Sequence, residues 1–282
     1  MEKTTKIQWC DSTVNPVMGC GGCELWTATT KACYAGNLHG RFGRTNPGYA
    51  NQFEAPETFD GRMQEAAGWK GLAGTVRPEK PWLNKRPRLI FVSDMGDALS
   101  TSIPFDYLRD EIIEAVVSEN GQQHYWLWLT KRPGRMASFS DWLLKQEISW
   151  PKNLWAGTSV TGPESYGRAN DLLSVGDADT VRFLSVEPQL AELDISRIVS
   201  RYDWVIHGGE SKQRGNDTRP FHLEWAEDLL DACRAAEVAY FLKQLGSDVR
   251  HEGERLTLKD GHGGDWDEWP EHLRVRQMPY CV

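Results

Sequence analysis

Short apolar runs rich in β-branched and aromatic residues alternate with stretches of helical periodicity from residue 88 onward. Six runs are predicted to be strands, at residues 89–93, 125–130, 154–160, 181–186, 204–208 and 239–243. Five stretches with helical spacing lie between them, at residues 107–117, 136–145, 165–173, 195–199 and 223–236. This alternation predicts a parallel sheet, either closed or doubly wound.

Each predicted strand is followed by a polar cluster, and the clusters share no common sequence. They occupy residues 93–97, 130–133, 159–161, 185–188, 208–211 and 243–244. No Gly-x-Gly-x-x-Gly follows the first strands, which argues against a dinucleotide-binding fold. With a further strand ending near Met18, the pattern favours an α/β fold with a parallel (βα) TIM-type barrel, partial or complete, whose strand ends converge on one mouth.

Residues 36–86 lack a sustained apolar period and are expected to form loops and short helices. We therefore expect a barrel over residues 1–245, including a cysteine loop at residues 10–34. Residues 246–282 are rich in turn-forming residues and are expected to form a C-terminal cap.

Composition narrows the function classes. The 282 residues carry a net charge of −8, which argues against a protein that grips extended nucleic acid, although a nucleotide-sized substrate stays open. No apolar run approaches the roughly 20 residues of a membrane span, and the first six residues lack a signal-peptide core, so we expect a cytoplasmic protein. The 13 Trp residues fit either a large aromatic core or stacking on a base.

The cysteines are unevenly placed. Cys10, Cys20, Cys23 and Cys33 lie close together, whereas Cys233 falls on the apolar face of a predicted helix and Cys281 is the penultimate residue. In a reducing compartment such a group indicates a metal or redox site rather than disulfides. Glycines at positions 19, 21 and 22 let the chain fold tightly around Cys20 and Cys23.

Two metal centres fit this spacing. Four thiolates would close a structural zinc site, in a zinc-stabilised barrel that binds nucleotides or nucleic-acid ends without radical chemistry. Three thiolates around a [4Fe–4S] cluster would leave one iron open. A third hypothesis, a hydrolytic barrel using Glu187 and Glu210, lacks a metal-binding histidine pair. The spacing alone does not separate zinc from iron–sulfur.

Several segments resemble one known family. They begin at Ile7-Gln-Trp-Cys-Asp-Ser-Thr-Val-Asn-Pro-Val-Met-Gly-Cys, and continue with Cys33-Tyr-Ala, Phe91-Val-Ser-Asp-Met-Gly-Asp, Leu129-Thr-Lys-Arg-Pro, Phe183-Leu-Ser-Val-Glu-Pro, Trp204-Val-Ile-His-Gly-Gly-Glu-Ser and Phe241-Leu-Lys-Gln. In this order they resemble the radical S-adenosylmethionine (radical SAM) superfamily, most closely a phage and bacterial family with a three-cysteine motif. Thr30 stands where that family has its middle cysteine, and Cys10 where it more often has Thr.

The resemblance implies a radical SAM enzyme that carries a [4Fe–4S] cluster and S-adenosylmethionine. It favours Cys20, Cys23 and Cys33 as metal ligands, with Cys10 as the substitute ligand or as a sulfur donor. It also implies an external electron donor and a small, nucleoside-like substrate, onto which sulfur could be transferred.

Cofactor-binding residues are then expected at the strand ends. Ser93, Asp94, Ser159 and Glu187 are candidates for the amino group or ribose, and Lys131 or Lys243 for a carboxylate. Thr130 belongs to the same cluster as Lys131, and Gly208 and Gly209 would allow close backbone approach to a ligand. Glu187 and Glu210 are the candidate catalytic carboxylates beside Cys10. For each charged residue the alternative is a structural helix cap or ion pair.

Overall fold

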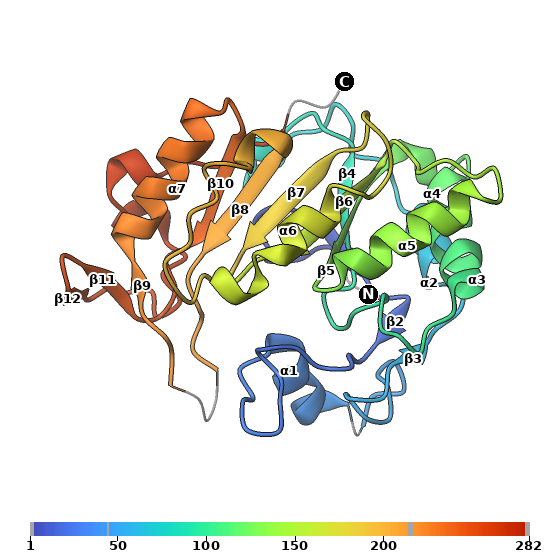
Figure 1. Cartoon of the computed structure of the whole chain (residues 1–282), viewed down its shortest axis with the longest axis horizontal. Helices are drawn as coiled ribbons and strands as arrows, with labels where there is room; N and C mark the ends of the chain where they lie inside the picture. Colours follow the sequence, from blue (N-terminus) through green and yellow to red (C-terminus); the bar gives the residue numbers. More distant parts are fainter. Residues whose placement is uncertain (1–2, 44, 214–216, 280–282) are drawn as a thin grey trace. The chain divides into compact units, whose positions relative to one another are not determined.

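The computed structural model of the chain describes residues 3–43, 45–213 and 217–279 (Figure 1). Seven strands form one sheet in the order β1-β4-β5-β6-β7-β8-β10. Their bounds are Ser12–Val14, Arg88–Val92, His124–Thr130, Leu154–Ser159, Arg182–Val186, Trp204–Gly208 and Ala239–Gln244. The predicted α/β class with a parallel sheet is confirmed. Among the described strands the order ends at β1 and β10, so the complete barrel that the sequence also allowed is not found.

The chain divides into two compact units. The first unit comprises Met1–Gly157 and Ser174–Val181, and the second comprises Thr158–Leu173 and Arg182–Val282. The division falls within β6, whereas the sequence placed a boundary after residue 245. Residues beyond that point belong to the second unit together with β7, β8 and β10.

In the first unit, β1 pairs in parallel with β4, and β4 with β5. All five residues of β4 are buried, which explains its continuous apolar sequence. The strand expected to end near Met18 is displaced. The sheet strand β1 ends at Val14, before Pro16, and β2 (Val17–Met18) pairs antiparallel with β3 (Glu57–Thr58).

Among the described residues the first unit has five helices, α1 (Tyr34–Phe42), α2 (Arg62–Ala67), α3 (Phe105–Leu108), α4 (Glu114–Val117) and α5 (Pro133–Leu144). The segments from α3 to α4 and α5 were predicted from periodicity, and α1 and α2 fall in or next to the region expected to hold loops and short helices. A π-helical turn, η2 (Arg109–Ile113), joins α3 to α4, so the two form the segment predicted at 107–117. Trp126, Trp128 and Trp155 are fully buried, and Trp128 stacks on Trp150 with ring centroids 6.1 Å apart. These tryptophans therefore build the core.

In the second unit, β7, β8 and β10 are parallel, and α7 (Leu223–Ala235) packs on β8 and β10 (Figure 1). Cys233 is buried on this helix, as its periodicity predicts. The unit also holds α6 (Gly167–Leu172) and a small sheet of β9 (Phe221–His222), β11 (Val249–His251) and β12 (Glu254–Leu256). The helix expected at 195–199 is only a 3₁₀ turn at Val199–Arg201.

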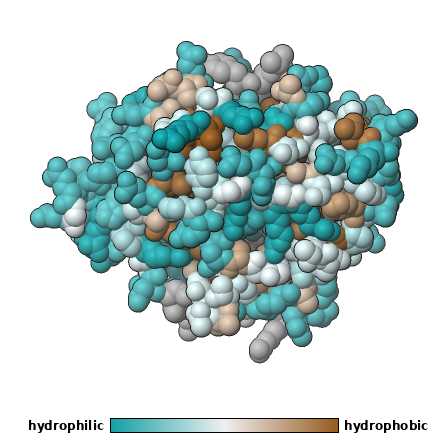
Figure 2. Space-filling model, in the orientation of Figure 1, coloured by the Kyte–Doolittle hydropathy of each residue, from teal (hydrophilic) through white to brown (hydrophobic). Residues whose placement is uncertain are grey.

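The described residues contain no helix that is long and apolar enough to span a membrane. Figure 2 shows a mostly hydrophilic face, on which apolar residues form small, separate groups. Exposed large apolar side chains include Tyr34, Phe42, Val76, Val117 and Leu144.

Candidate cofactor site

The cysteine loop begins where the strands of the first unit end. Gly19 follows β2 and forms an isolated bridge with Gly96, which lies beyond β4. A Cβ on Gly19 would lie 2.7 Å from the Phe53 carbonyl oxygen, and one on Gly96 would lie 2.6 Å from the Gly19 oxygen. Only glycine permits these approaches. The Gly19 amide donates to Met95 O at 3.4 Å and the Asp97 amide donates to Gly19 O at 3.2 Å, which holds Gly19 beside the loop after β4. The Cys20 amide then donates to Phe53 O at 2.7 Å, in the segment between α1 and β3.

The rest of the loop folds back so that the thiols of Cys23 and Cys33 lie near Cys20. Cys23 and Trp26 exchange backbone hydrogen bonds of 3.3 and 2.8 Å, and the Cys33 amide donates to Leu25 O at 3.0 Å. Cys33 is the N-cap residue of α1. Burial raises the pKa of the Cys33 thiol, and the nearby Cys23 and Cys20 sulfurs raise it further. The three thiols thus lie close enough to interact electrostatically.

A buried ion pair lies directly beside Cys20. Arg132 donates through Nη1 to Asp97 Oδ2 at 2.8 Å and to Cys20 Sγ at 3.6 Å, and through Nη2 to Gly22 O at 3.1 Å. Burial and the Asp97 charge raise the pKa of the Cys20 thiol, whereas the Arg132 charge and hydrogen bond lower it. Sequence reasoning placed Arg132 and Asp97 in polar clusters but did not select them, because their partners are distant along the chain.

Two of the predicted cofactor-binding residues support this pair. Thr130 Oγ1 donates to both oxygens of Asp97, at 2.9 and 3.0 Å, and the Lys131 amide donates to Asp97 Oδ2 at 3.2 Å. Lys131 Nζ lies 3.9 Å from Glu24 Oε1 in the cysteine loop. Both residues therefore lie at the site, and Thr130 acts by holding Asp97.

Ser93 is the strained residue of this site. It has a left-handed φ of 74°, which is uncommon for a residue with a side chain, and it is 5% exposed. Its hydroxyl finds no hydrogen-bond partner among the described residues. The neighbouring Asp94 accepts a 2.6 Å hydrogen bond from Asn15 Nδ2, and Asn15 Oδ1 accepts from the Met95 amide at 2.8 Å. A buried, unpaired hydroxyl on a strained backbone is a common feature of ligand-binding positions.

Cys10 lies apart from the other three thiols. The amide of the next residue, Asp11, donates to Leu89 O near the amino end of β4, whereas Cys20 lies beyond the carboxyl end of that strand. At about 3.3 Å per residue, the strand separates these ends by on the order of 10 Å. Cys10 is also fully buried. This placement disagrees with the prediction of Cys10 as a substitute ligand. The fold does not bring all four thiols together in one group.

One lysine holds the segment that carries Cys10. Lys80 Nζ donates to the carbonyl oxygens of Thr5, Ile7 and Cys10 at 2.7, 2.7 and 2.6 Å. An ammonium has three donors, and all three are used here. Burial lowers the pKa of Lys80. This contact is structural, and it keeps the Cys10 backbone at the amino end of β1.

The predicted charges of the second unit pair with each other. Glu187 and Lys243 form a close ion pair, with side chains 13% and 23% exposed. The alternative of an internal ion pair is therefore confirmed for Lys243. Ser159 is buried, and its carbonyl oxygen accepts a 3.2 Å hydrogen bond from Arg168 Nη1.

The glycines at the end of β8 make room for other parts of the backbone, not for a ligand. A Cβ on Gly209 would lie 2.2 Å from Leu245 O, and one on Gly208 would lie 2.9 Å from Gln244 O. The space that was expected to admit a ligand is thus occupied by the strand end of β10 and the residue after it. Glu210, 7% exposed, pairs with Arg219, whose amide and Nε each donate to Glu210 Oε2 at 2.9 Å.

A histidine that the sequence did not single out lies beneath this turn. His207 is fully buried, with Nδ1 2.8 Å from the Tyr240 hydroxyl and Nε2 2.5 Å from Gln189 Oε1. Because the Gln189 oxygen can only accept, Nε2 donates and Nδ1 accepts from Tyr240. Burial lowers the pKa of His207 to about 3. The imidazole is therefore a neutral part of the core.

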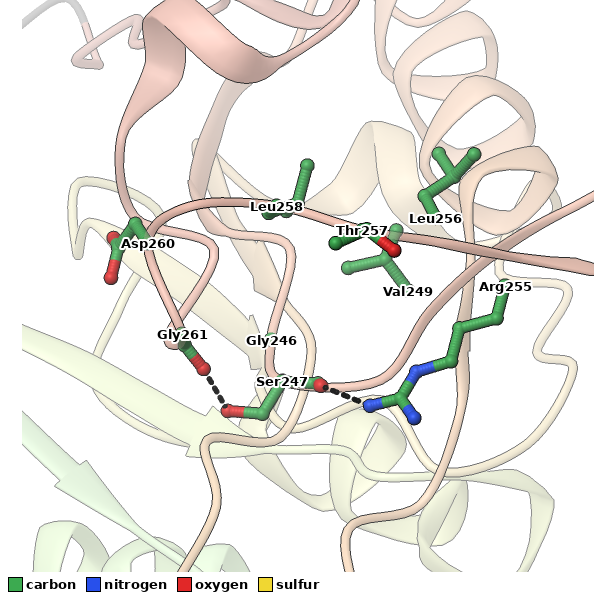
Figure 3. Close-up of a pocket in the computed structure, with 9 residues that line it drawn as sticks. All are labelled: Gly246, Ser247, Val249, Arg255, Leu256, Thr257, Leu258, Asp260 and Gly261. Carbon is green, nitrogen blue, oxygen red and sulfur yellow. Dashed lines mark hydrogen bonds between the residues drawn. The ribbon is translucent and has the colours of Figure 1, made fainter.

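The second unit also has a cavity of about 350 Å³ beside the β11–β12 hairpin (Figure 3). Three of its polar lining side chains are engaged with the protein. Ser247 Oγ donates to Gly261 O at 2.6 Å, Arg255 Nε lies 3.3 Å from Asp248 Oδ1, and Asp260 accepts hydrogen bonds from the backbone amides of residues 262, 264 and 265. These contacts describe a structural cleft, so the site is assigned to the first unit.

Three thiols and one guanidinium lie around Cys20. Cys20, Cys23 and Cys33 supply three half-buried soft ligands, and Arg132 supplies a positive charge beside one of them. The unpaired Ser93 hydroxyl supplies a polar atom in the loop after β4. Within the described ranges, no group of three or more His, Cys, Asp or Glu side chains is arranged so that it could hold a metal ion.

A family model described as "Protein of unknown function (DUF5131)" matches residues 4–270, so the chain belongs to this family. The matched range includes the cysteine loop and all seven strands of the parallel sheet. No curated protein and no solved structure matches the chain.

Proposed function

We propose that this member of the DUF5131 family is a radical SAM enzyme built on a partial (βα) barrel. The observation that supports the proposal is the grouping of three thiols, Cys20, Cys23 and Cys33, with Cys10 held at the other end of β1. Three thiolates suit a [4Fe–4S] cluster that keeps one iron without a protein ligand. A structural zinc site would need a fourth ligand, which Cys10 is not placed to provide.

A [4Fe–4S] cluster held by Cys20, Cys23 and Cys33 would supply the one-electron reduction of S-adenosylmethionine. The chain's own residues bind and orient the reactants and exclude water. Ser93 Oγ and the Asp94 carboxylate are the groups proposed to bind the amino group or the ribose. Their strand-end position and the unpaired hydroxyl support this role.

The substrate that we propose is a small, nucleoside-like molecule, with an external protein as electron donor. Sulfur transfer from Cys10 is not part of the proposal, because that side chain is fully buried and lies away from the other thiols. Glu187 and Glu210 are assigned structural roles, since each forms an ion pair with a basic partner within the second unit.

The test is anaerobic reconstitution followed by three measurements: iron and sulfide per chain, the electron paramagnetic resonance spectrum after reduction, and 5′-deoxyadenosine formed from S-adenosylmethionine. Release of deoxyadenosine without substrate makes the assay independent of the substrate's identity. Replacing Cys20, Cys23 or Cys33 by serine is expected to remove most of the bound iron and to lower the amount of deoxyadenosine formed by about 100-fold or more, because a direct ligand is lost.

Two other cysteines provide matched controls. Cys10→Ala and Cys233→Ala remove buried thiols outside the group and are expected to retain iron. A colourless wild-type protein with stoichiometric zinc would overturn the proposal. So would loss of iron in Cys10→Ala together with retention in Cys23→Ser, because the ligand set would then be a different one.

A further inference from the structure

Arg132 joins three separate segments of the first unit. Its guanidinium contacts Asp97 after β4, the Gly22 carbonyl in the cysteine loop, and the sulfur of Cys20. Arg132 itself immediately precedes α5 and is the N-cap residue of that helix. A single planar group therefore connects the loop after β5 to a thiol of the candidate cofactor site.

The guanidinium is held in place before any cofactor binds. The Arg132 amide donates to Thr130 Oγ1 at 2.9 Å, and that hydroxyl donates in turn to Asp97. Asp97 also accepts from the Leu99 amide at 3.0 Å, and its side chain is only 6% exposed. Because the carboxylate is fixed by several donors, the arginine that pairs with it has little freedom to turn away from Cys20.

The two glycines between Cys20 and Cys23 accommodate this arginine. A Cβ on Gly21 would lie 3.3 Å from Arg132 Nη2, a tight contact that its absence avoids. Gly22 has a φ of 91°, a left-handed conformation that glycine adopts without strain, and its carbonyl oxygen accepts from Arg132. The Gly-Gly pair is thus explained by the passage of the guanidinium past the loop.

We propose that Arg132 is a positioning residue that holds the cysteine loop in its ligating conformation and sets the reduction potential of the cluster through the Cys20 sulfur. This inference rests on the proposed function, because it needs a cluster at these thiols. Hydrogen bonds and positive charge at a ligating sulfur favour the reduced, more negative state. Arg132 therefore makes the cluster easier to reduce.

The experiment compares four variants of the full chain after anaerobic reconstitution. Arg132→Gln removes the charge, Arg132→Lys keeps the charge without the planar fork, and Asp97→Asn weakens the group that orients Arg132. Arg135→Gln is the matched control, because Arg135 lies three residues further along α5 and donates to Ile103 O at 2.6 Å instead of to the cysteine loop. The readouts are iron content and the midpoint potential from a redox titration followed by paramagnetic resonance.

For Arg132→Gln the midpoint is expected to move to a more negative value by about 59 mV, a tenfold change for a one-electron couple. Arg132→Lys is expected to shift by less, Asp97→Asn in the same direction as Arg132→Gln, and Arg135→Gln not at all. Loss of iron in Arg132→Gln with an unchanged circular dichroism spectrum, and retention in Arg132→Lys, also supports the positioning role.

An Arg132→Gln variant that binds iron and has the wild-type midpoint overturns the inference. If Arg132→Gln does not fold, Arg132→Lys decides, and an unchanged iron content and midpoint in that variant overturn the inference as well. A wild-type protein that takes up no cluster is a separate result, since it contradicts the proposed function itself and is seen before any arginine variant is compared.

Discussion

The strand ends of the first and second units carry similar side chains but use them differently. In the second unit, Glu187 pairs with Lys243 and Glu210 with Arg219, so each carboxylate is satisfied by its own unit. In the first unit, the arginine that pairs with Asp97 also donates to a thiol, and the Ser93 hydroxyl has no partner among the described residues. The strand ends of the first unit thus have polar groups that can still form hydrogen bonds to a ligand.

This difference separates structural from functional polar groups that look alike in the sequence. A buried polar atom without a partner costs stability, and so does a left-handed backbone at a residue other than glycine. Such costs are common where a ligand later supplies the missing contacts. The comparison therefore assigns candidate chemistry to the cysteine loop and stability to the Glu187 and Glu210 turns.

The largest expected effect is in the second unit. Lys243→Met leaves the Glu187 carboxylate, which is only 13% exposed, without its partner, and should lower the free energy of unfolding by about 3 kcal/mol. The double variant Glu187→Gln, Lys243→Met removes both charges and should recover most of that loss. Urea denaturation measures both. A Lys243→Met variant of wild-type stability would break the comparison, because Lys243 would then be available for a ligand.

The next effect is a pH dependence from His207. Its pKa falls from 6.5 in the unfolded chain to about 3 in the folded one, so below pH 6.5 the unfolded chain binds a proton that the folded chain excludes. Stability is therefore lost as pH falls from about 6.5 towards 3, by about 1.4 kcal/mol per pH unit.

Comparing slopes isolates this contribution. His207→Gln should show a shallower decrease in unfolding free energy between pH 6 and pH 4 than the wild type, whatever its stability at neutral pH. His272→Gln changes a half-exposed histidine paired with Glu227 and serves as the control for a histidine-to-glutamine replacement outside the core. Equal slopes in the wild type and His207→Gln would contradict a neutral, buried imidazole.

The smallest effect is a gain of stability in the first unit. Ser93→Gly relieves the left-handed conformation at φ 74° and removes the unpaired hydroxyl, and should stabilise the chain by about 1 kcal/mol. Ser93→Ala keeps the strain and should change stability by less than about 0.5 kcal/mol. Both should reduce deoxyadenosine formation at least tenfold, an estimate corresponding to one lost hydrogen bond. Destabilisation in Ser93→Gly would show that the hydroxyl is structural.

Most of the parallel sheet was predictable because its strands are buried on both faces and read as continuous apolar runs. The first strand was displaced because β1 has only three residues, too few for a pattern, and a second short strand follows it. The helix expected at 195–199 is only a 3₁₀ turn at Val199–Arg201, because three apolar positions in a window of five residues overstated the helical periodicity.

The candidate site was only partly predictable. The cysteine spacing identified the loop, but it could not separate Cys10 from the others, since that depends on which end of β1 each thiol occupies. We predicted Gly209 to be a ligand-binding glycine, because the sequence does not show that the backbone of Leu245 occupies the adjacent space. The pairing of Arg132 with Asp97 joins residues 35 positions apart and emerges only when the strands are aligned.

The Lys80 ammonium allows the amino-terminal segment to be monitored by chemical footprinting. All three of its protons are donated to carbonyl oxygens between Thr5 and Cys10, so in the folded chain this amine is protected from reductive methylation while exposed lysines such as Lys152 react. Methylation of Lys80, detected by peptide mass spectrometry, therefore reports release of the amino-terminal segment.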